Sequence, residues 1–317
     1  MSDLLKTIDA RTKLAGTNKL EILLFTLGVD QRSGRRENFG INVFKVREVM
    51  RTPEITQAPE MPNSVEGMVS LRGTLVPVID LARYAGIATG SRPEIMIVTE
   101  YNGHTQGFLV EAVDTILRLD WSSMRVPPDM LVTQMGGLVT AVTELDSNKL
   151  VMMLDVEKVL AETTQTDQTI DTSLVVQDHE LADKTVFFAD DSIVARRQIT
   201  LTLDAMNVHH QHAINGKRAW DELQRIAQSA DVHGKTVREM VQLVLTDVEM
   251  PEMDGYMLTK LIKSDARFAG IPVLMHSSLS GVSNQKLGQS VGVDGYVSKF
   301  EPHKLSEMIA GFLLKDA

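Results

Sequence analysis

The sequence contains no cysteine among its 317 residues. This absence excludes a disulfide framework, a cysteine-based metal site and a cysteine nucleophile, and it fits a reducing compartment. No apolar run approaches the roughly 18 to 20 residues that a membrane-spanning helix requires, and residues 1–20 lack the apolar stretch of a signal peptide. We therefore expect a soluble, cytoplasmic protein that does not insert into a membrane.

Basic residues are in the minority, with 32 Lys and Arg against 42 Asp and Glu, so the formal net charge is −10. An acidic chain is a poor candidate for binding nucleic acid as its main partner. The hydrophobic content of 43% is that of a globular protein, and a chain of this length is expected to form about two domains.

Residues 161–183 differ in composition from the rest of the chain. They are rich in Thr, Gln and Asp, and they contain six acidic residues but no lysine or arginine. Such a segment is typical of a solvated linker. The sequence therefore predicts one domain at residues 1–160, an acidic linker at 161–183 and a second domain at 184–317, with most of the negative charge in the linker.

The first domain is predicted to be mostly β-structure. Short apolar runs separated by turn residues lie at 22–27, 39–43, 75–79, 95–98, 107–110 and 151–154. Asn102-Gly103 between two of these runs predicts a hairpin, because both central residues of a type I′ turn need positive φ. We expect a barrel-like arrangement, since barrels leave no exposed sheet edges. The spacing of Val46, Val49 and Met50, and that of the segment before residue 20, predicts short helices.

The second domain alternates between strand-like and helix-like segments. Strands are predicted at 185–189, 208–213, 241–245, 271–276 and 295–297, and helices at 193–206, 217–229, 256–267, near 284–291 and at 302–314. Five such units imply an α/β doubly wound parallel sheet of five strands, flavodoxin-like, with its functional site at the carboxyl ends of the strands.

Polar residues follow four of these predicted strands: Asp190 and Asp191, Asp247, Ser277 and Lys299. Any one of them is explained by helix capping or surface charge, but their occurrence at four strand ends is not. Clustered carboxylates repel one another unless a hard cation such as Mg²⁺ lies between them. A carboxylate can also accept a phosphoryl group, whose oxygens a lysine and a hydroxyl would then bind.

The second domain resembles a response-regulator receiver domain. The resemblance rests on Phe-Ala-Asp-Asp at 188–191, on Asp-Val-Glu-Met-Pro-Glu-Met-Asp-Gly at 247–255 and on Gly-Tyr-Val-Ser-Lys at 295–299. It implies that Asp247 accepts a phosphoryl group from a histidine kinase. It further implies the roles of the remaining site residues: Mg²⁺ held by Asp191, Asp247 and the backbone carbonyl of Glu249 with Asp190 in support, Ser277 as the switch hydroxyl, Tyr296 as the switch aromatic residue and Lys299 as the phosphate-pairing lysine.

This sequence departs from the family pattern at two points, the first of which is segment 230–240, longer than the usual connection before the third strand. Receiver domains usually have proline directly after the lysine, whereas here the order is Lys299-Phe300-Glu301-Pro302. This second departure puts in doubt a cis bond straight after Lys299 and the usual geometry of that loop.

The first domain lacks clustered histidines, paired carboxylates and a phosphate-binding loop, so its residues do not indicate catalysis. By composition alone it is equally consistent with an ordinary barrel. Residues 40–49 and 65–81, however, resemble the CheW coupling domain of bacterial chemotaxis, a tandem of small SH3-like barrels, over about residues 20–160. That resemblance implies partner contacts around Val46, Glu48, Gly67 and Arg72, and Arg72 is the strongest candidate because arginine suits desolvated protein contacts.

The order of the two domains resembles that of CheV-type chemotaxis coupling proteins. The resemblance implies a cytoplasmic adapter that links the tips of chemoreceptors to the histidine kinase CheA, with CheW as a further partner, recruited to receptor arrays. Phosphorylation would tune the adapter for adaptation, or let it act as a phosphate sink. No enzymatic activity beyond slow self-dephosphorylation is expected.

Three other functions are compatible with parts of the sequence. A haloacid-dehalogenase-like phosphatase would use the aspartate cluster, but that class needs Asp-x-Asp where Asp190 and Asp191 are adjacent. A transcription factor would need a helix-turn-helix pattern or a basic stripe, which the chain lacks. A response regulator with a different protein-binding output remains open.

A metal site at His209, His210 and His212 is less expected than a structural role on the second predicted strand.

Overall fold

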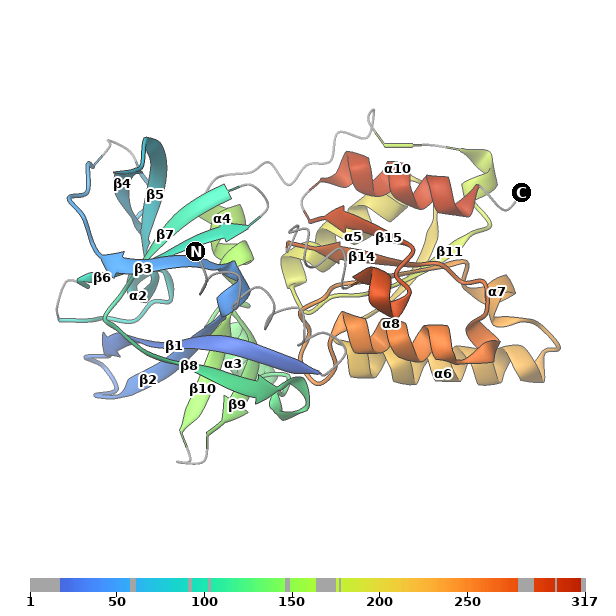
Figure 1. Ribbon diagram of the computed structural model, residues 1–317, viewed down its shortest axis with the longest axis horizontal. Helices are drawn as coiled ribbons and strands as arrows, with labels where there is room; N and C mark the ends of the chain where they lie inside the picture. Colours follow the sequence, from blue (N-terminus) through green and yellow to red (C-terminus); the bar gives the residue numbers. More distant parts are fainter. Residues whose placement is uncertain are drawn as a thin grey trace. The chain divides into compact units, whose positions relative to one another are not determined.

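The computed structural model describes residues 18–57, 61–90, 93–101, 104–145, 149–163, 175–176, 178–278, 288–299 and 301–314. The chain forms two compact units, one of Leu20–Thr166 and the other of Asp167–Ala317 together with Met1–Lys19 (Figure 1). None of the described helices is long and apolar enough to cross a membrane. The helix predicted before residue 20 lies outside the described residues.

The first unit contains two five-stranded sheets, which are ordered β8-β1-β2-β10-β9 and β3-β6-β7-β5-β4. The strands and helices of this unit are β1 (Lys19–Val29), β2 (Arg36–Asn42), β3 (Val46–Arg51), β4 (Val65–Leu71), β5 (Thr74–Asp80), α2 (Leu81–Tyr84), β6 (Ile95–Tyr101), β7 (His104–Val110), β8 (Ala112–Asp120), α3 (Asp129–Gln134), β9 (Val139–Glu144), β10 (Leu150–Leu154) and α4 (Val156–Thr163). Every predicted apolar run in this unit lies within a strand or reaches one residue past it.

A single buried cluster joins the two sheets of the first unit. Phe25 and Phe39 contribute from one sheet and Ile97 and Phe108 from the other, and Val159 of α4 packs into the same cluster. Each fully buried side chain of this size contributes about 1.5 to 3 kcal/mol. Because α4 belongs to this shared core, the first unit includes the chain at least as far as Thr163, where α4 ends.

One predicted helix of the first unit is wrong. Residues 46–51 form strand β3, in which half-buried and exposed residues alternate, and β3 pairs antiparallel with β6. Tertiary pairing overrides the helical spacing of three apolar residues, as it often does in short segments. The predicted hairpin is confirmed, since β6 and β7 pair antiparallel with Tyr101 opposite His104, although residues 102–103 lie outside the described part.

The second unit contains the predicted five-stranded parallel sheet, in the order β12-β11-β13-β14-β15. Its elements are β11 (Thr185–Ala189), α5 (Ile193–Ala205), β12 (His209–Ala213), α6 (Gly216–Val232), α7 (Val237–Met240), β13 (Leu243–Thr246), α8 (Gly255–Ser264), β14 (Val273–Ser277), β15 (Gly295–Ser298) and α10 (Pro302–Leu313). Helices α5 and α10 cover one face of the sheet, and α6 and α8 cover the other (Figure 1).

The core of the second unit includes residues that precede residue 184. Val175 and Leu181 are buried in its core, and a short 3-10 helix spans His179–Leu181, so the predicted linker is not solvated throughout. The helix expected near residues 284–291 is helical at 288–291, and its earlier part lies outside the described residues. The precise domain limits stay predictions.

Side chains at the start of three helices of the second unit explain where those helices begin. Ser192, Asn215 and Asp254 accept hydrogen bonds from the first turns of α5, α6 and α8 respectively. Such caps satisfy backbone N–H groups that have no partner within the helix. They fix the loops that follow β11, β12 and β13, which form the carboxyl edge of the sheet.

Candidate functional site

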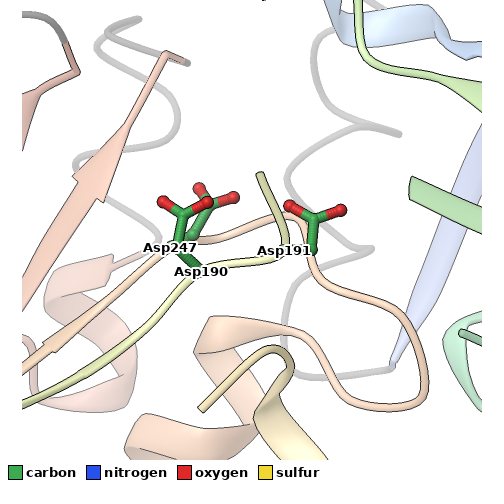
Figure 2. Close-up of side chains that lie close together, drawn as sticks. All are labelled: Asp190, Asp191 and Asp247. Carbon is green, nitrogen blue, oxygen red and sulfur yellow. The ribbon is translucent and has the colours of Figure 1, made fainter. Parts of the chain in front are cut away.

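Three aspartates from two neighbouring strands meet at the carboxyl edge of the parallel sheet (Figure 2). Asp190 and Asp191 follow β11, and Asp247 follows β13, which pairs with β11. One carboxylate oxygen of each lies within 4.8 Å of one of each of the others. The structure thus brings together the three aspartates that the sequence predicted.

Lys299 enters this cluster from the end of β15. Its Nζ lies 3.0 Å from Asp247 Oδ2 and 3.1 Å from Asp190 Oδ2. The side chains of Lys299, Asp190 and Asp247 are 2%, 0% and 4% exposed, so these charges interact with little screening by water. Lys299 thus pairs with two of the three carboxylates of the cluster.

The cluster fits Mg²⁺ by its donor chemistry. Carboxylate and carbonyl oxygens are the ligands that this hard cation prefers, and here three carboxylates approach one another closely. Glu249, whose backbone carbonyl was expected to join them, is buried two residues after Asp247. The assignment of these four residues as ligands stays a prediction.

Backbone hydrogen bonds fix the two loops that carry the aspartates. Asp247 Oδ1 accepts from Val248 N at 2.7 Å, and Asp190 Oδ1 accepts from Ser192 N at 2.9 Å. Gly255 approaches the Asp247 carbonyl so closely that an added Cβ would lie 2.0 Å from that oxygen. The loop that carries Asp247 is therefore packed closely against the start of α8.

Ser277 and Tyr296 lie on the neighbouring strands β14 and β15. Ser277 is fully buried at the end of β14, and it hydrogen-bonds the phenol of Tyr296. Burial raises the pKa of the Tyr296 phenol well above its usual range, and the hydrogen bond with Ser277 opposes this effect. Burial also raises the pKa of Tyr256, at the start of α8, and the nearby Tyr296 adds to it. The switch roles of Ser277 and Tyr296 stay predictions.

The candidate partner residues of the first unit divide into two groups. Arg72 lies at the β4–β5 turn with its side chain 72% exposed, and its Nη2 is 3.1 Å from Oε2 of the half-buried Glu48 on β3. Val46, half-buried, begins β3. Gly67 differs, because it is buried and an added Cβ would lie 2.3 Å from the Thr56 carbonyl oxygen.

Gly67 thus offers no exposed surface of its own, and partner contacts around this position stay a prediction. Gly67 has φ of +144°, which favours glycine, and the strand register shifts between Val65 and Gly67. Its requirement for glycine follows from the close approach of residue 56 to strand β4.

The three histidines lie on the edge strand β12, as the structural interpretation expected. His210 Nε2 is 3.1 Å from Asp204 Oδ1, and the ring of His212 stacks on Phe188 at 5.2 Å between centroids. Burial, followed by the nearby Arg196, lowers the pKa of His212. Across the described ranges, the aspartate cluster is the only group of three or more acidic, histidine or cysteine side chains close enough to hold a metal.

One residue at the site was missed by the sequence interpretation. Arg196 Nη1 donates to the backbone carbonyl of Asp190 at 2.8 Å. The available signal was its position, one helical turn after the Ser192 cap that follows the paired aspartates.

Comparison with known families matches each unit to a separate model. A CheW-like domain model matches residues 21–164, and a response regulator receiver domain model matches residues 186–310. Chemotaxis protein CheV3 of Helicobacter pylori is 29% identical over 284 residues, which cover 88% of this chain and 89% of that protein.

Two further relatives each match one unit. Chemotaxis protein CheW of Klebsiella aerogenes is 30% identical over 154 residues, covering 47% of this chain and 87% of the relative. Chemotaxis protein CheY1 of Helicobacter pylori is 33% identical over 122 residues, covering 38% of this chain and 89% of the relative. Similarity thus extends over both units and in the same order.

Proposed function

Because this chain belongs to the family of CheV-type chemotaxis coupling proteins, with a CheW-like domain followed by a receiver domain, we propose that it couples chemoreceptors to the histidine kinase CheA and that phosphorylation of Asp247 adjusts this coupling. It is a coupling scaffold with a phosphorylatable receiver domain. The convergence of Asp190, Asp191, Asp247 and Lys299 in the unit joined to the coupling domain supports the proposal most strongly.

The proposed reaction at Asp247 is a phosphoryl transfer. A carboxylate oxygen attacks the phosphorus of a phosphohistidine, a P–O bond forms, the P–N bond breaks, and the histidine nitrogen leaves with the electron pair and takes up a proton. When bound by Asp191, Asp247 and the Glu249 carbonyl, Mg²⁺ supplies positive charge that offsets the charge of the phosphoryl oxygens. In this proposal Lys299 binds a phosphoryl oxygen instead of the Asp247 carboxylate, and Ser277 donates a hydrogen bond to another phosphoryl oxygen.

Phosphorylation would change the surroundings of Tyr296. The modification adds roughly 1.5 to 2 negative charges and three acceptor oxygens. A Ser277 hydroxyl that turns to a phosphoryl oxygen leaves its bond with Tyr296, which frees that ring to adopt a second position. A difference of about 1.4 kcal/mol between two conformations shifts their ratio tenfold, so a small coupling suffices.

The proposed partners are CheA, the cytoplasmic tips of chemoreceptors and CheW, at receptor arrays in the cytoplasm. The phosphate stored on Asp247 would serve adaptation or remove phosphate from the kinase. Slow hydrolysis of that phosphate is the only reaction that we assign to the chain itself.

The proposal is tested by sedimenting receptor signalling domains with CheA and the full chain, with and without ATP. We expect the wild-type chain to sediment with the array in the absence of ATP, and the amount bound to change on addition of ATP. Asp247→Asn should bind equally under both conditions, because it cannot take up phosphate. Failure of the unphosphorylated chain to sediment contradicts the adapter function, and identical behaviour of both variants contradicts the switch.

Arg72→Ala is expected to weaken binding to the array while leaving the fold intact. The ion pair of Arg72 with Glu48 is exposed, and such pairs contribute about 0.2 to 1 kcal/mol. Arg72 also has φ of +52°, uncommon for a side chain with a Cβ, and the exposed turn that requires it presents the guanidinium to solvent. Sedimentation should fall about tenfold or more if Arg72 is central to the interface.

The matched control is Arg36→Ala. Arg36 is 54% exposed and forms a similar ion pair, 2.8 Å from Glu111, in the other sheet. Both variants should unfold at nearly the temperature of the wild type. Equal loss of binding in both variants, or none in Arg72→Ala, argues against a specific role for Arg72.

A further inference from the structure

Arg196 reaches from the second turn of α5 to the loop that carries the two adjacent aspartates. Its Nη1 donates to the backbone carbonyl of Asp190 at 2.8 Å, and the residue is half-buried. That carbonyl belongs to the peptide unit that joins Asp190 to Asp191. The contact therefore acts on the backbone immediately before Asp191 and not on a carboxylate.

The same loop is held at three other points. Asp190 N donates to the Ala213 carbonyl at 3.3 Å, Asp190 Oδ1 accepts from Ser192 N at 2.9 Å, and Lys299 Nζ lies 3.1 Å from Asp190 Oδ2. These contacts fix Asp190 in the sheet and at the helix cap. The hydrogen bond from Arg196 fixes the orientation of the peptide plane between Asp190 and Asp191, and this plane leads directly to the Cα that carries the Asp191 side chain.

The charge of Arg196 and its hydrogen bond have opposite effects on a cation at the aspartate cluster. A positive charge near the cluster repels Mg²⁺, so its loss by itself should strengthen metal binding. A charge-assisted hydrogen bond is about twice as strong as a neutral one, and its loss should release the peptide plane and weaken metal binding. The sign of the change on removal of Arg196 therefore separates the two effects.

We propose that Arg196 is a positioning residue for the metal site: by holding the Asp190 carbonyl, it keeps the Asp191 carboxylate where it can share a cation with Asp247. This inference rests on the proposed receiver function and adds a residue to it. Loss of a hydrogen bond that orients a metal ligand commonly lowers metal affinity by about 10- to 100-fold.

The test is a titration of the full chain with MgCl₂, followed by the amide shifts of Asp191 and Gly255 in ¹H–¹⁵N spectra. Arg196→Met removes both the charge and the donor, and we expect its dissociation constant for Mg²⁺ to rise about tenfold or more. Arg197→Met is the matched control, because this exposed neighbour on α5 carries the same charge. Its dissociation constant should stay within about twofold of the wild-type value.

Thermal unfolding in the absence of Mg²⁺ shows whether each variant folds. If Arg196→Met does not fold, Arg196→Lys takes its place; it keeps the charge but not the planar set of donors, so we expect Mg²⁺ binding about two- to fivefold weaker than that of the wild type. A folded Arg196 variant with wild-type or tighter affinity overturns the positioning role and leaves the proposed function standing. A wild-type chain whose amide shifts do not respond to Mg²⁺ overturns the metal site itself, and this inference with it.

Discussion

Asp247→Asn is expected to take up no phosphate from phosphorylated CheA, the largest functional effect that the structure predicts. The amide of asparagine has no anionic oxygen to attack phosphorus, so transfer to this position should be lost. The fold should persist, because Val248 N can still donate to the side-chain oxygen as it does at 2.7 Å in the wild type. The measurement is transfer of radiolabelled phosphate from CheA to the full chain, with release by hydroxylamine as the mark of an acyl phosphate.

Asp221→Asn is the matched control for this experiment. Asp221 lies on α6, where it forms an exposed ion pair with Lys217, and the substitution makes the same chemical change. Transfer to this variant should equal transfer to the wild type. Label that persists on Asp247→Asn at the wild-type rate would move the acceptor to another residue and overturn the assignment.

The second unit was predictable because each of its core strands carries its own signal. Strand β13 is buried throughout and β11 is buried from Val186 onward, so both contain short continuous apolar runs in the sequence, as expected for a parallel sheet covered on both faces. The aspartate that follows each of these runs identifies the carboxyl edge of the sheet, where the site lies. Predicted and observed strands therefore agree to within about two residues, and the aspartate cluster follows from the strand order.

The first unit was less predictable because several of its strands are half exposed or irregular. Strand β8 is almost entirely exposed or half-buried, and β4 is interrupted by the irregularity at Gly67. Neither forms a continuous apolar run, and neither was predicted. Strand β3 alternates between half-buried and exposed residues, a pattern that three apolar residues with helical spacing concealed.

Contacts of side chains with particular backbone carbonyls could not be predicted from the sequence. The bond from Arg196 to the Asp190 carbonyl depends on the orientation of a peptide plane, which residue type does not fix. The burial of Gly67 depends on where residue 56 crosses strand β4. Sequence patterns identify which residues share an edge or a face, whereas such packing emerges only when the elements meet.

Gly255→Ala is expected to lower the free energy of unfolding of the second unit by about 3 kcal/mol, the largest effect on stability that the structure predicts. An added Cβ would lie 2.0 Å from the Asp247 carbonyl oxygen and 2.9 Å from its carbon, distances that only a shift of the backbone can relieve. The shift would move the loop that carries Asp247, so phosphate uptake at Asp247 should fall along with stability. Gly255 also donates its N–H to the Val248 carbonyl at 3.0 Å, which holds it against this loop.

Gly311→Ala is the matched control, because a Cβ at this position in α10 meets nothing within 4 Å. Alanine in a helix is favoured over glycine by about 0.5 to 1 kcal/mol, so this variant should be slightly more stable than the wild type. Each unit contains one tryptophan, Trp121 or Trp220, so urea unfolding followed by fluorescence in a Trp121→Phe background reports on the second unit alone. Equal stability of Gly255→Ala and Gly311→Ala would show that the loop carrying Asp247 accommodates the added Cβ, and would contradict the close packing of Gly255 against the Asp247 carbonyl.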